Sequence, residues 1–260
     1  MRGLVGAVAL LTRVPIPRRM HALGRPGRAI PWIPVVGAAI GAMVGAIALA
    51  ALLIGVPGHV AAIVAVAVAL LVTGALHEDG LADTFDGLGS GRRGNEAIEI
   101  MRDPRIGVFG AAALTVSVLL QIATLGSLTR SMIVGVAIAA HAASRGFVVL
   151  ATYLPLATSH GLAATYSDRI HPAARPAGFV AGVAIAVAML REDAWILMLA
   201  LVAGALVVAW ARQRIGGITG DVLGGVQQVT MLTILVGATV HCCASTITSR
   251  GPTGDTDPHA

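Results

Sequence analysis

The chain contains no lysine, few aromatic residues and few charged residues of either sign. Aromatic side chains make up 3% of its 260 residues and charged side chains 12%. Soluble globular domains carry about 25% charged residues, so neither a water-soluble fold nor intrinsic disorder fits this composition. Base-stacking platforms need aromatic side chains, so nucleic-acid binding is set aside. The two cysteines, Cys242 and Cys243, are adjacent and lack the spacing of a disulfide or a metal-binding pair.

Long apolar runs fill most of the chain instead. The hydrophobic fraction is 56% and the mean hydropathy is +0.84. A helix that crosses a bilayer needs about 20 mostly apolar residues. The candidate spans are Val35–Val56, Val60–Leu76, Gly107–Leu128, Met132–Leu154, Gly178–Leu190, Ala194–Ala211 and Val222–Ala244. The short run at 178–190 either spans or is re-entrant. The sequence thus predicts an all-α, polytopic helical bundle in the lipid bilayer, with about seven transmembrane helices.

Arginine positions predict how this bundle is oriented. If the N-terminus is cytoplasmic, 14 of the 18 arginines lie in cytoplasmic segments, three lie on the opposite side and Arg145 lies within a span. This asymmetry follows the positive-inside rule. We expect one catalytic domain over residues 1–245 and a polar, mobile tail over 246–260. Gly37, Gly41 and Gly45 form a ridge of small residues that favours close helix packing.

Acidic residues cluster after the second span. Seven of the 13 acids lie between His77 and Ile106. If the helix of that span continues, Asp79, Asp83 and Asp86 share one stripe. Such carboxylates repel one another, and a bound divalent cation removes the conflict. Oxygen ligands with room for water and phosphate suit Mg²⁺. A solvated acidic face is the alternative; neighbouring glycines favour the metal site, because they let a ligand or another backbone approach.

Three further features are candidates for holding phosphate. Arg102 and Arg105 follow the acidic cluster, although basic residues are also common at the cytoplasmic interface. Arg145 is costly inside a span, so it faces an anion in a polar cavity or pairs with an aspartate. The glycine-rich turn Gly216–Asp221 precedes the last span and can present backbone N–H groups to phosphate. Asp221 either caps that helix or binds the cation.

Four stretches of the chain carry a resemblance to a known family. They are Leu11–Arg19, His77–Gly87, Glu99–Gly107 and Gly216–Gly224, and Ser144-Arg145-Gly146 also fits. The second contains a specific His-x-Asp-Gly-Leu-Ala-Asp-x-x-Asp-Gly block, in which Glu78 occupies the variable second position and points off the aspartate stripe. The chain resembles the adenosylcobinamide-GDP ribazoletransferase family, also called cobalamin 5′-phosphate synthase.

The resemblance implies a bacterial inner-membrane enzyme late in cobalamin synthesis. It implies that adenosylcobinamide-GDP is joined to α-ribazole or its 5′-phosphate, with Mg²⁺ as cofactor and release of GMP. Expected metal ligands are Asp79, Asp83, Asp86 and Asp221, and one of the first three or His77 accepts the proton of the attacking hydroxyl. Expected substrate contacts are Arg13, Arg102, Arg105, Arg145, Gly217, Thr219 and Gly220.

Two other functions stay open at this point. A CDP-alcohol phosphatidyltransferase also binds metal and a nucleotide diphosphate through aspartates on a membrane helix, but Asp83 and Thr84 stand where its Ala-Arg pair belongs. A transporter would use Arg145 as a substrate ligand, although the charged residues collect on one side of the membrane. The sequence does not choose between α-ribazole and its phosphate, and it leaves the oligomeric state open, a homo-oligomer included.

Overall fold

The computed structural model describes residues 2–16, 26–158 and 170–249, and these are almost entirely helical. The helices are α1 (Arg2–Leu11), α3 (Ile33–Leu53), α4 (Gly58–Thr73), α5 (Leu76–Gly89), α6 (Asn95–Met101), α7 (Val108–Ser127), α8 (Ile133–Ala151), α10 (Ala174–Leu190), α11 (Ile196–Ile215) and α12 (Gly220–Ser249). Short 3-10 turns, η1 (Pro26–Arg28), η2 (Ile30–Trp32) and η3 (Arg191–Trp195), link some of them. The only β-pairing in the described ranges is an isolated bridge between Leu156 and Ile218. The expected all-α membrane bundle is confirmed.

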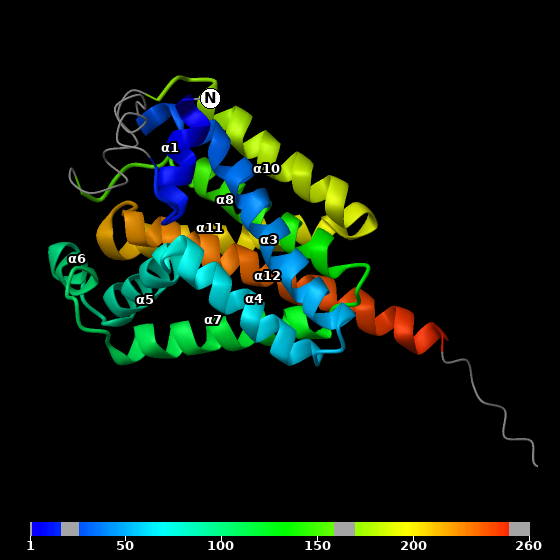
Figure 1. Ribbon diagram of the computed structural model, residues 1–260. Helices are drawn as coiled ribbons and strands as arrows, with labels where there is room; N and C mark the ends of the chain where they lie inside the picture. The colour runs from blue at the N-terminus through cyan, green and yellow to red at the C-terminus, as the bar shows by residue number, and fades with distance from the viewer. Residues whose placement is uncertain (1, 17–25, 159–169, 250–260) are drawn as a thin grey trace, which may run out of the picture.

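The long helices run back and forth between the two ends of the bundle (Figure 1). The predicted spans correspond to α3, α4, α7, α8, α10, α11 and α12. By length and apolarity, the described residues contain five stretches able to cross a membrane, or six if the bent pair α4 and α5 forms one span. This number is below seven because α4 is short and because the 42-residue stretch Ala174–Ile215 counts once, although η3 divides it into α10 and α11.

One expectation about the acidic segment is wrong. The helix of the second span does not continue into it, because the chain turns by 88° between α4 and α5. Gly74 ends α4 in the left-handed conformation, with φ of 65°, and Ala75 follows with φ of 55°. Glycine adopts this region freely, whereas alanine does so only under constraint from its surroundings. The acidic stripe therefore lies on its own helix, α5, which crosses the end of α4 nearly at a right angle.

Helices α8 and α12 form the centre of the bundle, because 72% and 67% of the most apolar part of each helix is buried. The predicted glycine ridge of α3 packs on α8. A Cβ at Gly41 would lie 2.8 Å from the Ala137 carbonyl carbon, and one at Gly45 would lie 2.6 Å from the Val134 Cα. Backbone contact at this distance leaves no room for side chains. Since lipid removes the hydrophobic drive for association, such close packing holds membrane helices together.

The polar elements gather at one end of the bundle. Helices α5 and α6, the last turns of α11 and the first turns of α12 meet there, next to the short apolar helix α1, at the left of Figure 1. At the other end, Arg130 donates a hydrogen bond to the Leu52 carbonyl oxygen, at 2.9 Å. Helix α12 continues to Ser249, into the segment expected as a tail, and residues 250–260 lie outside the described ranges. The domain boundary stays a prediction.

Candidate active site

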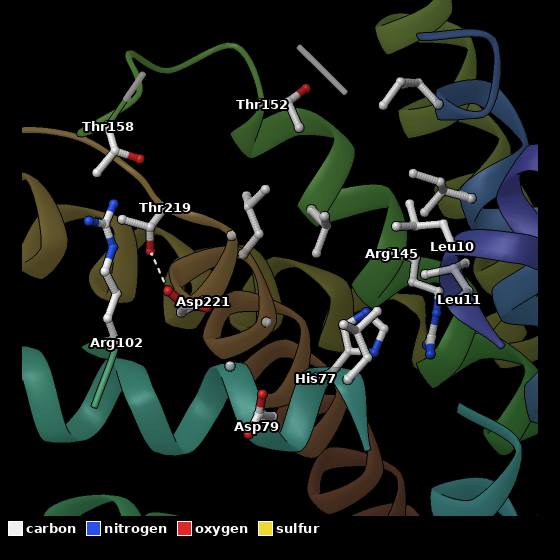
Figure 2. A pocket seen from close by; sticks show the side chains of 18 of the residues that line it. Leu10, Leu11, His77, Asp79, Arg102, Arg145, Thr152, Thr158, Thr219 and Asp221 are labelled. Atoms are coloured by element: carbon white, nitrogen blue, oxygen red, sulfur yellow. Dashed lines mark hydrogen bonds between the residues drawn. The ribbon is translucent and has the colours of Figure 1, made fainter. Parts of the chain in front are cut away.

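A cavity of about 560 Å³ opens among these polar elements. Figure 2 shows its polar side chains, which come from α5, α8, α12, the end of α6 and the segments before α10 and α12. They are His77, Asp79, Arg102, Arg145, Thr152, Thr158, Thr219 and Asp221. Six of these eight were expected at the site; Thr152 and Thr158 were not. The cavity thus collects residues from four separate stretches of the sequence.

The crossing of α5 and α12 brings two aspartates to this cavity. A Cβ at Gly80 would lie 2.9 Å from the Asp221 carbonyl oxygen and 3.1 Å from the Gly224 Cα. The two backbones therefore touch at this point. Asp79 is next to Gly80 on α5, and Asp221 is itself part of the contact on α12. Asp79 points into the cavity from α5, and Asp221 faces it from the first turn of α12 (Figure 2). The expectation that Gly80 admits another backbone is confirmed.

Asp79, Asp83 and Asp221 form an acidic cluster at this crossing. Asp83 is half-buried, does not line the cavity, and is repelled by Asp79, Asp221 and Asp86. Arg102 lies at the same end of the cavity as Asp221 (Figure 2) and attracts it. Within the described ranges, no three acidic, histidine or cysteine side chains converge as a ready-made metal site. Mg²⁺ does not require one, because it commonly binds one or two carboxylates and completes its shell with water and substrate phosphate. The donor chemistry therefore fits this ion.

The structure places Asp86 away from the cavity and gives both of its oxygens other partners. Its Oδ2 accepts a hydrogen bond from the Gly107 backbone N–H at 2.7 Å, and its Oδ1 accepts one from the Gly110 N–H at 2.8 Å. These two donors belong to the start of α7, where backbone N–H groups have no partner within the helix. Asp86 thus caps α7 and secures it to α5. Its two oxygens lie on Gly107 and Gly110, not beside Asp79.

The residues of the glycine-rich turn have two different structural roles. Gly217 packs against the segment before α10, because a Cβ there would lie 2.6 Å from the Pro155 carbonyl oxygen. Gly217 does not line the cavity, whereas Thr219 and Gly220 do. The Thr219 hydroxyl accepts a hydrogen bond from the Val222 N–H at 3.2 Å and donates to Asp221 Oδ2 at 3.4 Å. Thr219 therefore caps α12 and orients Asp221.

Arg145 is the largest polar side chain buried in the described bundle, with 2% of its surface exposed. Its Nη1 donates to the His141 carbonyl oxygen at 3.1 Å and to the His141 ring Nδ1 at 3.2 Å. Its Nε has no hydrogen-bond partner among the described residues. His77 is also buried and lies beside it at the cavity wall. No aspartate forms an ion pair with Arg145 in the described ranges, and Arg145 is part of the cavity wall. Its contact with an anion stays a prediction.

Glu78 is a buried residue whose role the sequence did not reveal. Its Oε1 accepts a hydrogen bond from Gln228 Nε2 at 2.8 Å, and Gln228 Oε1 accepts one from the Ser117 hydroxyl at 3.1 Å. Glu78 is the carboxylate whose charge acts on Arg145, and both residues line a second, very small cavity in the interior. A glutamine in an apolar span needs a partner, so Gln228 was the signal that could have predicted this network.

Two other predicted arginines lie outside the cavity. Arg105 forms an ion pair with Asp103 at 2.7 Å, and 87% of its side chain is exposed. The Arg105 hydrogen bonds lower the pKa of Asp103 to about 2. Arg13 packs on Gly74 at the turn between α4 and α5, and its backbone N–H donates to the Val72 carbonyl oxygen at 2.7 Å. Arg13 therefore supports the bend that orients the acidic helix.

Comparison with known proteins identifies relatives of one kind over nearly the whole chain. The family model described as cobalamin-5-phosphate synthase matches residues 3–239. Relatives named adenosylcobinamide-GDP ribazoletransferase include one from Rhizobium etli, 40% identical, covering 88% of this chain and 93% of the relative. Another from Azorhizobium caulinodans is 38% identical over 80% of this chain and 83% of its own length. A third, from Chlorobaculum tepidum, is 36% identical over 88% and 91%.

No solved structure matches the chain significantly. The family assignment therefore rests on sequence, and it covers every helix that contributes to the cavity. It also decides among the three functions left open above in favour of a transferase of cobalamin biosynthesis. The chain belongs to the cobalamin-5-phosphate synthase family.

Proposed function

We propose that this chain is a Mg²⁺-dependent transferase that joins adenosylcobinamide-GDP to α-ribazole or α-ribazole 5′-phosphate and releases GMP. The relatives' names supply the two substrates. One observation carries the proposal: Asp79 and Asp221 face the same cavity from two helices whose backbones touch, and Arg102 lines the cavity near Asp221. Carboxylates and a cation so placed suit a metal-bound diphosphate.

The reaction exchanges one phosphate–oxygen bond for another. A ribose hydroxyl oxygen of the acceptor bonds to the phosphorus attached to cobinamide, while the bond from that phosphorus to the bridging oxygen breaks. GMP leaves with the bridging oxygen and its electron pair. The hydroxyl proton passes to a base at the cavity wall, either His77 or one of the neighbouring carboxylates. When bound, Mg²⁺ neutralises the charge that develops on the diphosphate oxygens.

The side chains around the cavity supply positioning, on which phosphoryl transfer largely depends. Asp79 and Asp221, supported by Asp83, hold the cation. Arg102 and Arg145 contact phosphate oxygens from opposite sides. The first turn of α12 contributes the Gly220 backbone and the positive end of a long helix dipole. Direct attack by the ribose hydroxyl requires no covalent intermediate on the protein.

We also propose an orientation for the protein in the membrane. It is a multi-pass protein of the bacterial inner membrane, with its N-terminus and the cavity on the cytoplasmic side. Support comes from the arginine distribution and from the position of α1, α5 and α6 at one end of the bundle (Figure 1). A cysteine-accessibility scan in spheroplasts tests it: a cysteine placed at Arg92 should be protected from impermeant reagents, and one at Arg130 should react.

The decisive test is the reaction with purified protein in detergent. Adenosylcobinamide-GDP and α-ribazole are incubated with and without Mg²⁺, and GMP is followed. We expect GMP to form only with the metal and both substrates. Asp79→Asn should abolish the reaction while the protein still inserts and folds. Full activity of a folded Asp79→Asn or Asp83→Asn variant would remove the acidic cluster from the mechanism.

A further inference from the structure

The cavity has a second wall that the chemistry above does not use. This wall is apolar and comes from other elements: Leu10 and Leu11 of α1, Ile30 of η2, Ile33 of α3 and Val148 of α8. Figure 2 shows Leu10 and Leu11 across the cavity from Arg102, Thr219 and Asp221. The cavity therefore has one end with Arg102, Thr219 and Asp221 and another, here called the apolar end, where these aliphatic side chains lie beside Arg145 and His77.

An apolar wall can bind only some of the organic groups that the two substrates carry. Naming these substrates rests on the proposed function. Guanine presents several hydrogen-bonding atoms, and each would lose its partner against aliphatic side chains. The corrin ring carries amide side chains and exceeds the size of ligand that a cavity of about 560 Å³ encloses. The base of α-ribazole is a flat dimethylbenzimidazole with no N–H group. It alone matches the wall in both size and polarity.

We propose that the apolar end is the subsite for the benzimidazole base of the acceptor, formed by Leu10, Leu11, Ile30, Ile33 and Val148. With the base held there, the ribose points toward His77 and Asp79 at the middle of the cavity (Figure 2). The attacking hydroxyl then lies between the base subsite and the diphosphate at the acidic cluster. The subsite also sets base selectivity: it favours apolar bicyclic bases and disfavours purines, whose exocyclic amine stays without a partner.

The test changes the polarity of the wall with little change in its volume. Leu10→Asn and Val148→Thr alter half-buried side chains at the cavity, and Leu4→Asn, on the same helix but away from the cavity, is the matched control. We compare kcat/KM for α-ribazole with kcat/KM for the corresponding adenine riboside. Apolar pockets discriminate by roughly tenfold or more per methylene-sized change. We expect kcat/KM for α-ribazole to fall about tenfold in each cavity variant. The ratio of kcat/KM for α-ribazole to kcat/KM for the adenine riboside should fall as well.

The outcomes separate this inference from the proposed function. If the unmodified protein releases no GMP from the two substrates, the proposed function fails. If it does, and the cavity variants change the KM of adenosylcobinamide-GDP alone, the wall holds guanosine or corrin and the subsite is refuted. If neither KM changes, the wall contacts neither substrate and the subsite is refuted as well. Equilibrium dialysis of α-ribazole alone gives a second measurement, in which Leu10→Asn should bind more weakly than Leu4→Asn.

Discussion

Gly80→Ala tests whether the contact between α5 and α12 sets the geometry of the acidic cluster. A methyl group at Gly80 would lie 2.9 Å from the Asp221 carbonyl oxygen, about 0.5 Å closer than ordinary contacts allow. Both partners are backbone, so no side-chain rotation relieves the overlap. The helices must part, and Asp79 moves away from Asp221. Overpacking of this kind costs about 1–3 kcal/mol of stability, which a bundle of this size tolerates.

The effect on activity should exceed the effect on folding. A displacement of 1 Å in a positioned site costs about 100-fold in rate, so half of that distance corresponds to about tenfold. We expect Gly80→Ala to lower kcat for GMP release about tenfold and to raise the Mg²⁺ concentration for half-maximal activity, because the ion loses a ligand at its preferred distance.

Gly135→Ala is the matched control, since its Cβ would meet only the Met189 carbonyl oxygen at 3.7 Å. Both variants are purified in the same detergent and compared by thermal unfolding and by Mg²⁺ titration of the rate. If Gly80→Ala is folded and matches Gly135→Ala in both rate and Mg²⁺ dependence, the helix crossing does not position the carboxylates and the reasoning is wrong.

Three further substitutions separate structural from catalytic roles. Asp86→Ala should lower the thermal unfolding temperature through the loss of a helix cap, about 1–2 kcal/mol, with the Mg²⁺ requirement unchanged; a raised requirement at unchanged stability would make Asp86 a metal ligand instead. Glu78→Gln should lower the thermal unfolding temperature, because it removes the carboxylate charge that acts on the buried Arg145; a variant that unfolds at the unchanged temperature would contradict that role. Arg105→Ala should leave GMP release unchanged while raising the pKa of Asp103 from about 2 toward its ordinary value, measured by NMR titration. Because the pKa of Asp103 is lower in the folded state than in the unfolded state, its ion pair with Arg105 stabilises the fold at pH values above the unfolded pKa. This stabilisation is lost as the pH falls through the folded pKa.

Local patterns in the sequence predicted much of this protein. Continuous apolar runs defined the helices that cross the bundle, and small residues at every fourth position marked the face of α3 that packs on α8. The arginine distribution separated the two ends of the bundle. The aspartates of the His77–Gly87 block marked this segment as a candidate cation site, because carboxylates close together on one helix repel one another unless a cation compensates their charge. Each of these signals comes from residues near one another in the chain.

Only the tertiary structure decided how those segments are used. Nothing local distinguishes Asp86 from Asp79, yet one caps α7 and the other faces the cavity, because α7 begins beside Asp86. The turn of 88° at Gly74 separates α5 from the span that precedes it. Asp79 and Asp221 are 142 positions apart in the sequence. They face the same cavity because Gly80 and Gly224 let the two backbones touch. The apolar wall from α1 had no sequence signal, since leucines in a membrane protein face lipid, core and ligand alike. Hydropathy and spacing are properties of one segment, whereas the direction in which a side chain points depends on which helix packs beside it.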